Sequence, residues 1–180
     1  GESGGIILPH FEVIDFEEGP ENFDALAMGT DFGFNHPHAT LLLGYRDGGV
    51  YVLSELVARE KDTNEICKLL KTFFSDEHIM WSDSAEPARI LALQRAGFKA
   101  RAVKKEAGSV HAQIDWLKSR PLVVHPSCRH TISELSVWAW KYDAAANTYL
   151  DEPVNVFDDA IAALRYGIEG WRRGSEVSFV

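Results

Sequence analysis

Residues 27–57, AMGTDFGFNHPHATLLLGYRDGGVYVLSELV, decide the fold because they hold three β-prone segments separated by short turns. Residues 27–34 form a strand pattern that ends in a glycine turn, and residues 39–45 are apolar and β-prone. Residues 50–57 alternate between apolar and polar side chains, which is typical of a strand with one buried face. The intervening Arg-Asp-Gly-Gly, residues 46–49, is a hairpin signal. We therefore predict an antiparallel meander of three strands.

Beyond residue 57 the sequence alternates between helical and strand patterns. The last helix has the clearest apolar stripe, with spacings of 4, 3, 4 and 3 between Phe157, Ile161, Leu164, Ile168 and Trp171. A meander followed by helix-linked, mostly parallel strands is the order of a ribonuclease H-like fold. We therefore predict an α/β domain with a mixed sheet and helices on both faces. The predicted helices are 63–74, 87–96, 109–118, 131–140 and 155–171, the strands 78–83, 99–103 and 121–125, and a polar hairpin covers 142–150.

The chain of 180 residues is long enough for one domain with a sizeable core. We expect an irregular N-terminal arm or linker over residues 1–26, the folded domain over 27–174 and a tail over 175–180. No run of apolar residues is long enough to span a membrane, and the first residues lack the pattern of a signal peptide. The two cysteines, Cys67 and Cys128, are expected to be reduced thiols in a cytosolic-type compartment.

The charge distribution is uneven. The net charge of −9 and the isoelectric point near 5.2 do not fit a protein that grips nucleic acid by itself. Basic residues nevertheless gather between residues 95 and 105 and again between 165 and 173. A basic rim on an acidic protein is one reading of these groups, and a solvated surface is the other. If the chain binds nucleic acid, metal ions or another domain must supply part of the attraction.

Four aspartates carry the predicted chemistry. Asp31 and Asp83 each end a strand, and ligands collect at the carboxyl ends of strands in α/β sheets. Asp158 and Asp159 open the last helix, whose N-terminus could face the same edge. Two carboxylates ~5 Å apart repel by roughly 3 kcal/mol at an effective dielectric near 20, and a divalent cation removes that repulsion. Asp oxygens suit Mg²⁺ or Mn²⁺, and two ions can activate a water and stabilise a leaving oxygen.

Each of these acids also has a purely structural alternative. Asp31 could serve the turn before Gly33, Asp83 could cap the next helix, and Asp158 and Asp159 could simply favour the positive end of the helix dipole. The histidine pair His36 and His38 flanks a proline in a turn and is expected to be solvent-exposed, whereas His125 and His130 are expected to be structural. No P-loop, dinucleotide-binding loop or serine hydrolase triad is recognisable.

Four segments give the sequence a family resemblance that covers nearly the whole chain. They are GTDFGF at residues 29–34, WSDSAEP at 81–87, Val-Lys-Lys with the following Gly-Ser-Val within 103–110, and the helix 155–166 that ends in Ala-Leu-Arg-Tyr. In this order they resemble the C-terminal nuclease domain of the large terminase subunit of tailed bacteriophages and prophages. The resemblance implies a metal-dependent endonuclease that cuts concatemeric DNA during genome packaging.

The resemblance also implies a role for each site residue. Asp31, Asp83 and either Asp158 or Asp159 would hold two Mg²⁺ or Mn²⁺ ions for phosphodiester hydrolysis. Lys104 and Lys105 would contact DNA phosphates or offset developing charge. Glu86 would orient a ligand or a water molecule, with an acid in the first turn of a helix as its alternative. Ala162 departs from the family, which often has an acid immediately before Ala-Leu-Arg-Tyr.

The partners implied by the resemblance are double-stranded DNA, an N-terminal ATPase motor domain, the portal and the small terminase subunit. The chain has no Walker A sequence, so the motor would lie outside it. The implied location is the cytoplasm of the bacterial host cell, away from the membrane. Two other functions stay open: a resolvase-type or transposase-type nuclease of the same fold, and a non-catalytic packaging module, which Ala162 favours.

Overall fold

The computed structural model describes residues 5–174. Its main sheet has seven strands in the order β1-β7-β4-β3-β2-β5-β6, and β8 and β9 form a separate hairpin. The strands are β1 (Glu12–Val13), β2 (Ala25–Asp31), β3 (His38–Arg46), β4 (Gly49–Ala58), β5 (Ile79–Ser82), β6 (Lys99–Ala102), β7 (Leu122–Val124), β8 (Trp140–Asp143) and β9 (Thr148–Pro153). The helices are η1 (Pro20–Asn22), α1 (Thr63–Phe73), α2 (Pro87–Arg95), α3 (Ser109–Lys118), α4 (Arg129–Val137), α5 (Asp159–Gly167) and α6 (Glu169–Arg173).

The predicted meander is present as β2, β3 and β4. The three strands pair antiparallel, with Asp31 opposite Ala39 next to the β2–β3 connection and Arg46 opposite Gly49 at the β3–β4 hairpin. Asp47 and Gly48 both have positive φ, 49° and 75°, as a two-residue turn with the twist of the flanking strands requires. The hairpin signal in the sequence therefore identified this turn correctly.

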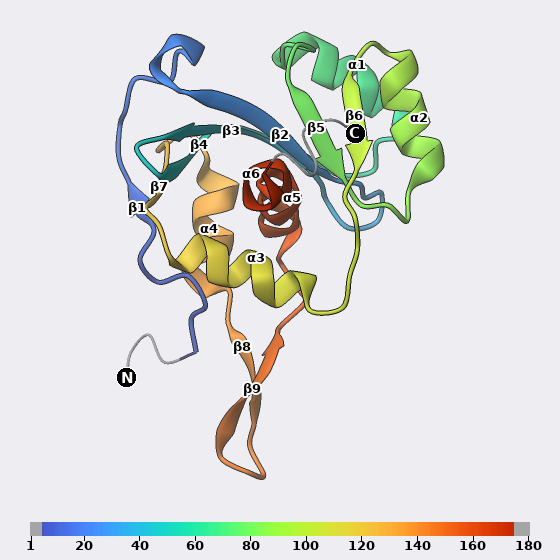
Figure 1. The fold of residues 1–180 in the computed structure, drawn as a ribbon. Helices are drawn as coiled ribbons and strands as arrows, with labels where there is room; N and C mark the ends of the chain where they lie inside the picture. Colours follow the sequence, from blue (N-terminus) through green and yellow to red (C-terminus); the bar gives the residue numbers. More distant parts are fainter. Residues whose placement is uncertain (1–4, 175–180) are drawn as a thin grey trace.

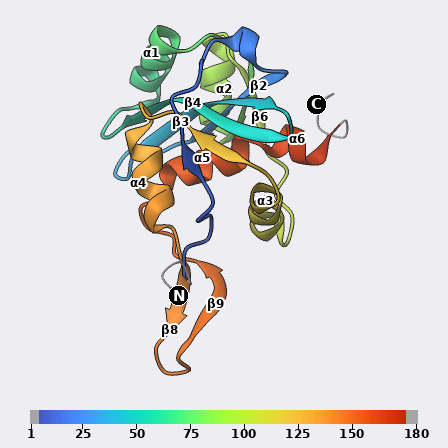
Figure 2. The same cartoon turned by 90° about the vertical axis from the view of Figure 1, so that its left-hand side faces the viewer.

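Parallel strands extend the meander on both sides. β5 pairs parallel with β2, and β6 pairs parallel with β5. On the other side β7 pairs parallel with β4, and β1 with β7. Figures 1 and 2 show α1 and α2 on one face of the sheet and α3, α4 and α5 on the other, with the β8–β9 hairpin projecting away from the body. This confirms the predicted mixed α/β architecture with helices on both faces.

Each face of the sheet has its own buried core. The larger core joins β3, β4 and β7 to α3, α4 and α5, and the smaller one joins β2 and β5 to α1 and α2. Helix α1 begins with a capping box in which the Asp62 side chain accepts the Glu65 N–H. No helix among residues 5–174 is long and apolar enough to cross a membrane.

Helix α5 packs unusually close to β2, and a glycine makes this possible. A Cβ added at Gly29 would lie 1.8 Å from the Ala163 carbonyl oxygen and 2.7 Å from the Gly167 nitrogen. Backbone therefore meets backbone where α5 crosses the strand. This contact brings the first turn of α5 over the end of β2, where Asp31 lies.

The final helix differs from its predicted range. The sequence favours one helix over 155–171, whereas α5 begins at Asp159 and α6 follows it from Glu169. Phe157 has φ +51° and is 45% exposed, so it lies outside the apolar stripe that it was expected to begin. The periodicity of the stripe could not reveal this because one apolar residue before a helix fits the same spacing.

The N-terminal residues contribute to the fold more than their weak periodicity indicates. Ile7 and Leu8 are fully buried in the larger core, and the Ile7 N–H donates to the Trp138 carbonyl. β1 then adds the outer strand beside β7. An irregular arm was expected here because short apolar pairs carry no period. The tail over 175–180 lies outside the described residues.

Candidate metal centre

The carboxyl ends of β2 and β5 meet at one edge of the sheet. Met28, Gly29 and Thr30 pair in parallel register with Met80, Trp81 and Ser82. Asp31 is the last residue of β2 and Asp83 directly follows β5, so both acids lie at the same edge of the sheet. A shared site for these two acids requires that β2 and β5 are parallel neighbours. The structure shows that they are.

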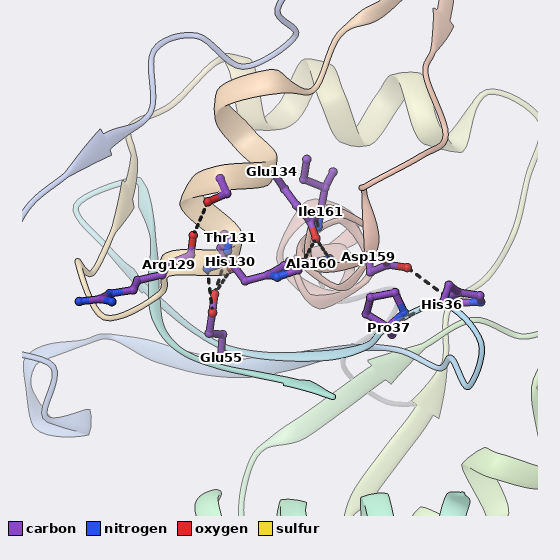
Figure 3. Close-up of polar contacts among 11 residues, drawn as sticks. His36, Pro37, Glu55, Arg129, His130, Thr131, Glu134, Asp159, Ala160 and Ile161 are labelled. Carbon is purple, nitrogen blue, oxygen red and sulfur yellow. Dashed lines mark hydrogen bonds and ion pairs between the residues drawn. The ribbon is translucent and has the colours of Figure 1, made fainter. Parts of the chain in front are cut away.

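The N-terminus of α5 brings a third acid to this edge. Asp159 is the first residue of the helix and is only 7% exposed. Its Oδ1 lies 3.1 Å from Nδ1 of His36, whose ring comes from the connection between β2 and β3. Figure 3 shows these two side chains pointing toward each other. Ligand atoms of Asp31, His36 and Asp159 all lie within 4.8 Å of one another.

Asp31 is held in an environment that disfavours its charge. Burial, together with the negative charges of Asp159 and Asp158, raises the pKa of Asp31 to about 7, and the nearby His36 only partly offsets this. The pKa of Asp158 is raised for the same reasons, burial first and Asp159 second. Neighbouring buried carboxylates of this kind have a strong electrostatic preference for a bound cation.

A cavity of about 540 Å³ opens onto this group. Acidic, amide and aromatic side chains line it, and all come from the connections around β2, β4 and α5: Asp31, Asn35, His36, Pro37, Arg59, Asn155, Val156, Phe157, Asp158 and Asp159. The cavity is open to solvent on one side, since the His36 side chain is 62% exposed. Both acids at the start of α5 therefore reach the cavity, but only Asp159 belongs to the close group with Asp31.

Asp83 is engaged by other partners. Its Oδ1 lies 2.8 Å from Nζ of Lys105 and accepts the Ala85 N–H, and the Tyr166 hydroxyl donates to Oδ2 over 3.4 Å. Burial alone would raise the pKa of Asp83, but the hydrogen bonds from Lys105 and Ala85 outweigh it and hold the pKa below its ordinary value. Asp83 is therefore a carboxylate with a lysine ammonium already beside it.

The two predicted DNA-contacting lysines lie in the connection between β6 and α3. Lys104 is 66% exposed and pairs with Glu106, while Lys105 pairs with Asp83. They line a second cavity of about 250 Å³ together with Ser109 and Arg165. Basic side chains thus lie near the acids, since Lys105 pairs with Asp83 and the Arg165 charge acts on Asp31 and Asp158.

Other residues singled out in the sequence lie elsewhere. Glu86 stands at the start of α2, with its carboxylate 3.7 Å from Nε of Arg89. His38 is buried on β3 beside Thr40, and burial lowers its pKa to about 3, so it is not the exposed turn residue that was expected. His36 is the site residue that the sequence did not favour. The one available signal was its place in the short connection that follows Asp31.

The donor set fits a hard or borderline divalent cation. Two carboxylates and one imidazole offer oxygen and nitrogen ligands, with solvent access for water ligands. Mg²⁺ favours the oxygens, and Mn²⁺ also accepts the imidazole nitrogen. Both cysteines of the chain are buried away from this group, Cys67 on α1 in the smaller core and Cys128 in the larger core. The site chemistry therefore suits Mg²⁺ or Mn²⁺.

Comparisons with known proteins agree with this fold. Residues 31–170 match the family described as Terminase RNAseH like domain. The PBSX phage terminase large subunit of Bacillus subtilis (strain 168) is 22% identical, and the match covers 95% of this chain and 41% of that protein. The chain therefore spans well under half the length of this curated relative.

Solved structures show the same fold at low sequence identity. The large terminase nuclease domain of bacteriophage SPP1 with bound Mn has a TM-score of 0.79 and 20% identity, covering 90% of this chain and 97% of that one. The P22 large terminase nuclease domain has a TM-score of 0.71 and 17% identity, with 92% of each chain covered. The nuclease of phage G20c with bound magnesium has a TM-score of 0.63 and 14% identity, covering 91% and 96%. Since the family match spans most of the described residues, this chain belongs to the terminase ribonuclease H-like domain family.

Proposed function

We propose that this chain is a divalent-metal-dependent DNA endonuclease that cuts concatemeric viral DNA during genome packaging. One observation carries the proposal: ligand atoms of Asp31, His36 and Asp159 gather within 4.8 Å at the carboxyl end of β2, next to a cavity. Family membership supports it, as do the Mn and magnesium bound to the SPP1 and G20c nuclease domains. The ATPase motor, the portal and the small subunit are proposed partners, and the host cytoplasm is the proposed location.

The proposed ligands fall into two groups. Asp31, His36 and Asp159 would hold one ion, with Asp158 close enough to take part through the same cavity. Asp31 and Asp83 would hold a second ion, which would compete with Lys105 for the Asp83 carboxylate. The ions would supply positive charge for polarising the phosphate and for lowering the pKa of a bound water.

The surrounding side chains would bind and orient the DNA strand. Lys105, once released from Asp83, and Lys104 would each contact a phosphate oxygen beside the acids. Burial raises the pKa of Tyr166 to about 12, with Asp83 and Asp31 adding to the shift, so the phenol stays protonated and can donate a hydrogen bond. Glu86 keeps only its predicted role of orienting a water or a ligand.

The test is cleavage of supercoiled plasmid in Mn²⁺, in Mg²⁺ and in EDTA. We expect cutting that needs the metal, that is abolished in Asp31→Asn and that falls by a factor of at least about 100 in Asp159→Ala. Asp158→Ala should have the smaller effect, because its carboxylate lies outside the close group. The control is Asp115→Asn, which changes an exposed acid on α3 and should cut like the wild type. Full cutting by folded Asp31→Asn would overturn the proposal.

One observation favours a second candidate, a packaging module that binds a partner but does not cut. Ala162 is buried against Trp81, Val103 and Tyr166, so this helical position beside the site offers no carboxylate. Mn²⁺ binding without cleavage in either metal would favour the module. A preference for branched over linear duplex DNA would instead favour a resolvase-type nuclease.

A further inference from the structure

The first turn of α5 is held by a buried carboxylate from another helix. Glu134 on α4 is fully buried, and its two oxygens accept the N–H groups of Ala160 and Ile161 over 3.1 and 2.9 Å. These are two of the donors that a helix N-terminus leaves without partners inside the helix. Figure 3 shows the Glu134 side chain reaching from α4 to the start of α5, directly beside Asp159.

This arrangement is unusual because α5 already has a good capping residue of its own. Asp158 occupies the N-cap position, where an Asp side chain ordinarily accepts the N–H groups of the next turn. In this structure the Asp158 side chain makes no such bond, and Glu134 takes the N–H groups instead. The carboxylates of Asp158 and Asp159 are thereby left to face the cavity.

A second contact fixes the residue that precedes the two acids. Nε2 of His130 lies 2.7 Å from Oε2 of Glu134. The His130 ring also packs against the Phe157 ring, with centroids 5.3 Å apart. Phe157 has φ +51°, a left-handed conformation that is strained in a residue other than glycine. Contacts on both sides of the two acids therefore hold the chain in place.

Helix α4, which carries Glu134, is itself anchored to the sheet. Glu55 on β4 accepts the N–H groups of His130 and Thr131 at the start of α4, and the Thr131 hydroxyl donates to it over 2.7 Å. One carboxylate thus ties α4 to the sheet, and a second ties α5 to α4. This chain of contacts ends at the first turn of α5, which begins with Asp159 (Figure 3).

We propose that Glu134 is a positioning residue that takes over the capping of α5 and so keeps Asp158 and Asp159 free to bind a divalent cation. It acts through the backbone of Ala160 and Ile161 and touches neither the ion nor DNA. The inference rests on the proposed metal site. Without Glu134, the Asp158 carboxylate would turn to cap its own helix, and the cavity would lose ligands.

The test measures Mn²⁺ affinity rather than cleavage. The electron paramagnetic resonance signal of free Mn²⁺ is recorded at a temperature well below the unfolding midpoint of each variant. Glu134→Gln keeps the shape and one acceptor oxygen, whereas Glu134→Ala keeps neither. We expect the Kd for Mn²⁺ to rise by about 10-fold or more in Glu134→Gln and further in Glu134→Ala, as for other groups that orient metal ligands. The control is Asp62→Ala, which removes the cap of α1 and should lose stability while binding Mn²⁺ like the wild type.

Each outcome decides whether Glu134 positions the acids or only stabilises the fold. A folded Glu134→Gln variant with wild-type Mn²⁺ affinity would show that Glu134 only stabilises the fold. If neither Glu134 variant folds, His130→Ala decides, because this partly exposed side chain links Glu134 to Phe157. Weaker Mn²⁺ binding by His130→Ala supports positioning, and unchanged binding overturns it. Wild-type protein that binds no Mn²⁺ would instead overturn the metal site, and the inference with it.

Discussion

At the residue scale, the burial of Asp31 near two other acids disfavours its charged form and so makes the metal-free fold less stable at high pH. The pKa of Asp31 is raised from 3.8 to about 7, so the folded state holds its proton more tightly than the unfolded state does. Stability from this group is therefore present below pH 4 and is lost as the pH rises toward 7. The loss reflects the cost of ionising a buried carboxyl group that lies near Asp159 and Asp158.

Asp31→Asn is accordingly expected to stabilise the metal-free protein at pH 8, by up to a few kcal/mol, because the neutral amide avoids the buried charge. The gain should shrink as the pH falls to 4, where Asp31 is protonated in the wild type. Urea unfolding of both proteins in EDTA across this range measures the difference. The same variant should lose the stabilisation that Mn²⁺ gives the wild type. Equal urea midpoints at pH 8 would contradict the raised pKa.

The imidazole of His36 is expected to set a preference between metals. Nitrogen ligands suit Mn²⁺ better than Mg²⁺, so His36→Ala should weaken Mn²⁺ binding by about 10-fold and Mg²⁺ binding by less. Isothermal titration with each metal measures the two changes. His10→Ala, an exposed histidine that contacts the Arg120 carbonyl, serves as the control. An equal loss for both metals would show that His36 orients Asp159 rather than binding the ion.

At the element scale, the site depends on the close crossing of α5 and β2. Gly29→Ala would place a methyl carbon 1.8 Å from the Ala163 carbonyl oxygen, which no side-chain rotation can relieve. We expect a loss of stability of about 1–3 kcal/mol or more as α5 is pushed from the strand. Mn²⁺ affinity should fall with it, because Asp159 moves away from Asp31.

Gly44→Ala is the matched control for this prediction. The added methyl group on β3 would meet side-chain atoms of Phe23 and Leu53 rather than backbone atoms, and side chains can shift more easily. It should cost less stability than Gly29→Ala and leave Mn²⁺ affinity unchanged. Chemical denaturation and Mn²⁺ titration of the two variants give the comparison. Equal Mn²⁺ affinity in the two folded variants would mean that the position of α5 does not control the site.

At the scale of the whole molecule, an acidic protein carries a small basic region beside the candidate site. The net charge is −9, while Lys104, Lys105 and Arg165 gather beside the site. We expect weak DNA binding that depends strongly on salt, and a slope of log K against log salt that falls by about 1–2 in Lys104→Ala/Lys105→Ala. Fluorescence anisotropy with duplex DNA across a salt series measures the slope. Lys68→Ala on α1, across the sheet from α5, should leave it unchanged.

The sequence by itself determined the parts of this protein that depend on local pattern. Alternation and the Asp-Gly turn identified the meander, and the same strand patterns located Asp31 and Asp83 at strand ends. The start of α5 was predicted less well. The predicted helix begins at residue 155, whereas Asp158 is the N-cap and has a non-helical backbone, which periodicity cannot detect. Helical spacing therefore could not separate Asp158 from Asp159.

Only the tertiary structure decided which side chains meet. His36 and Asp159 are 123 positions apart in sequence, and their 3.1 Å contact depends on α5 crossing β2 at Gly29. Glu134 likewise reaches Ala160 and Ile161 only because α4 packs beside α5. Residue type and spacing fix what each segment can form, but the sheet order and the helix crossings fix its neighbours. Those neighbours set the charge, burial and ligand geometry on which a metal site depends.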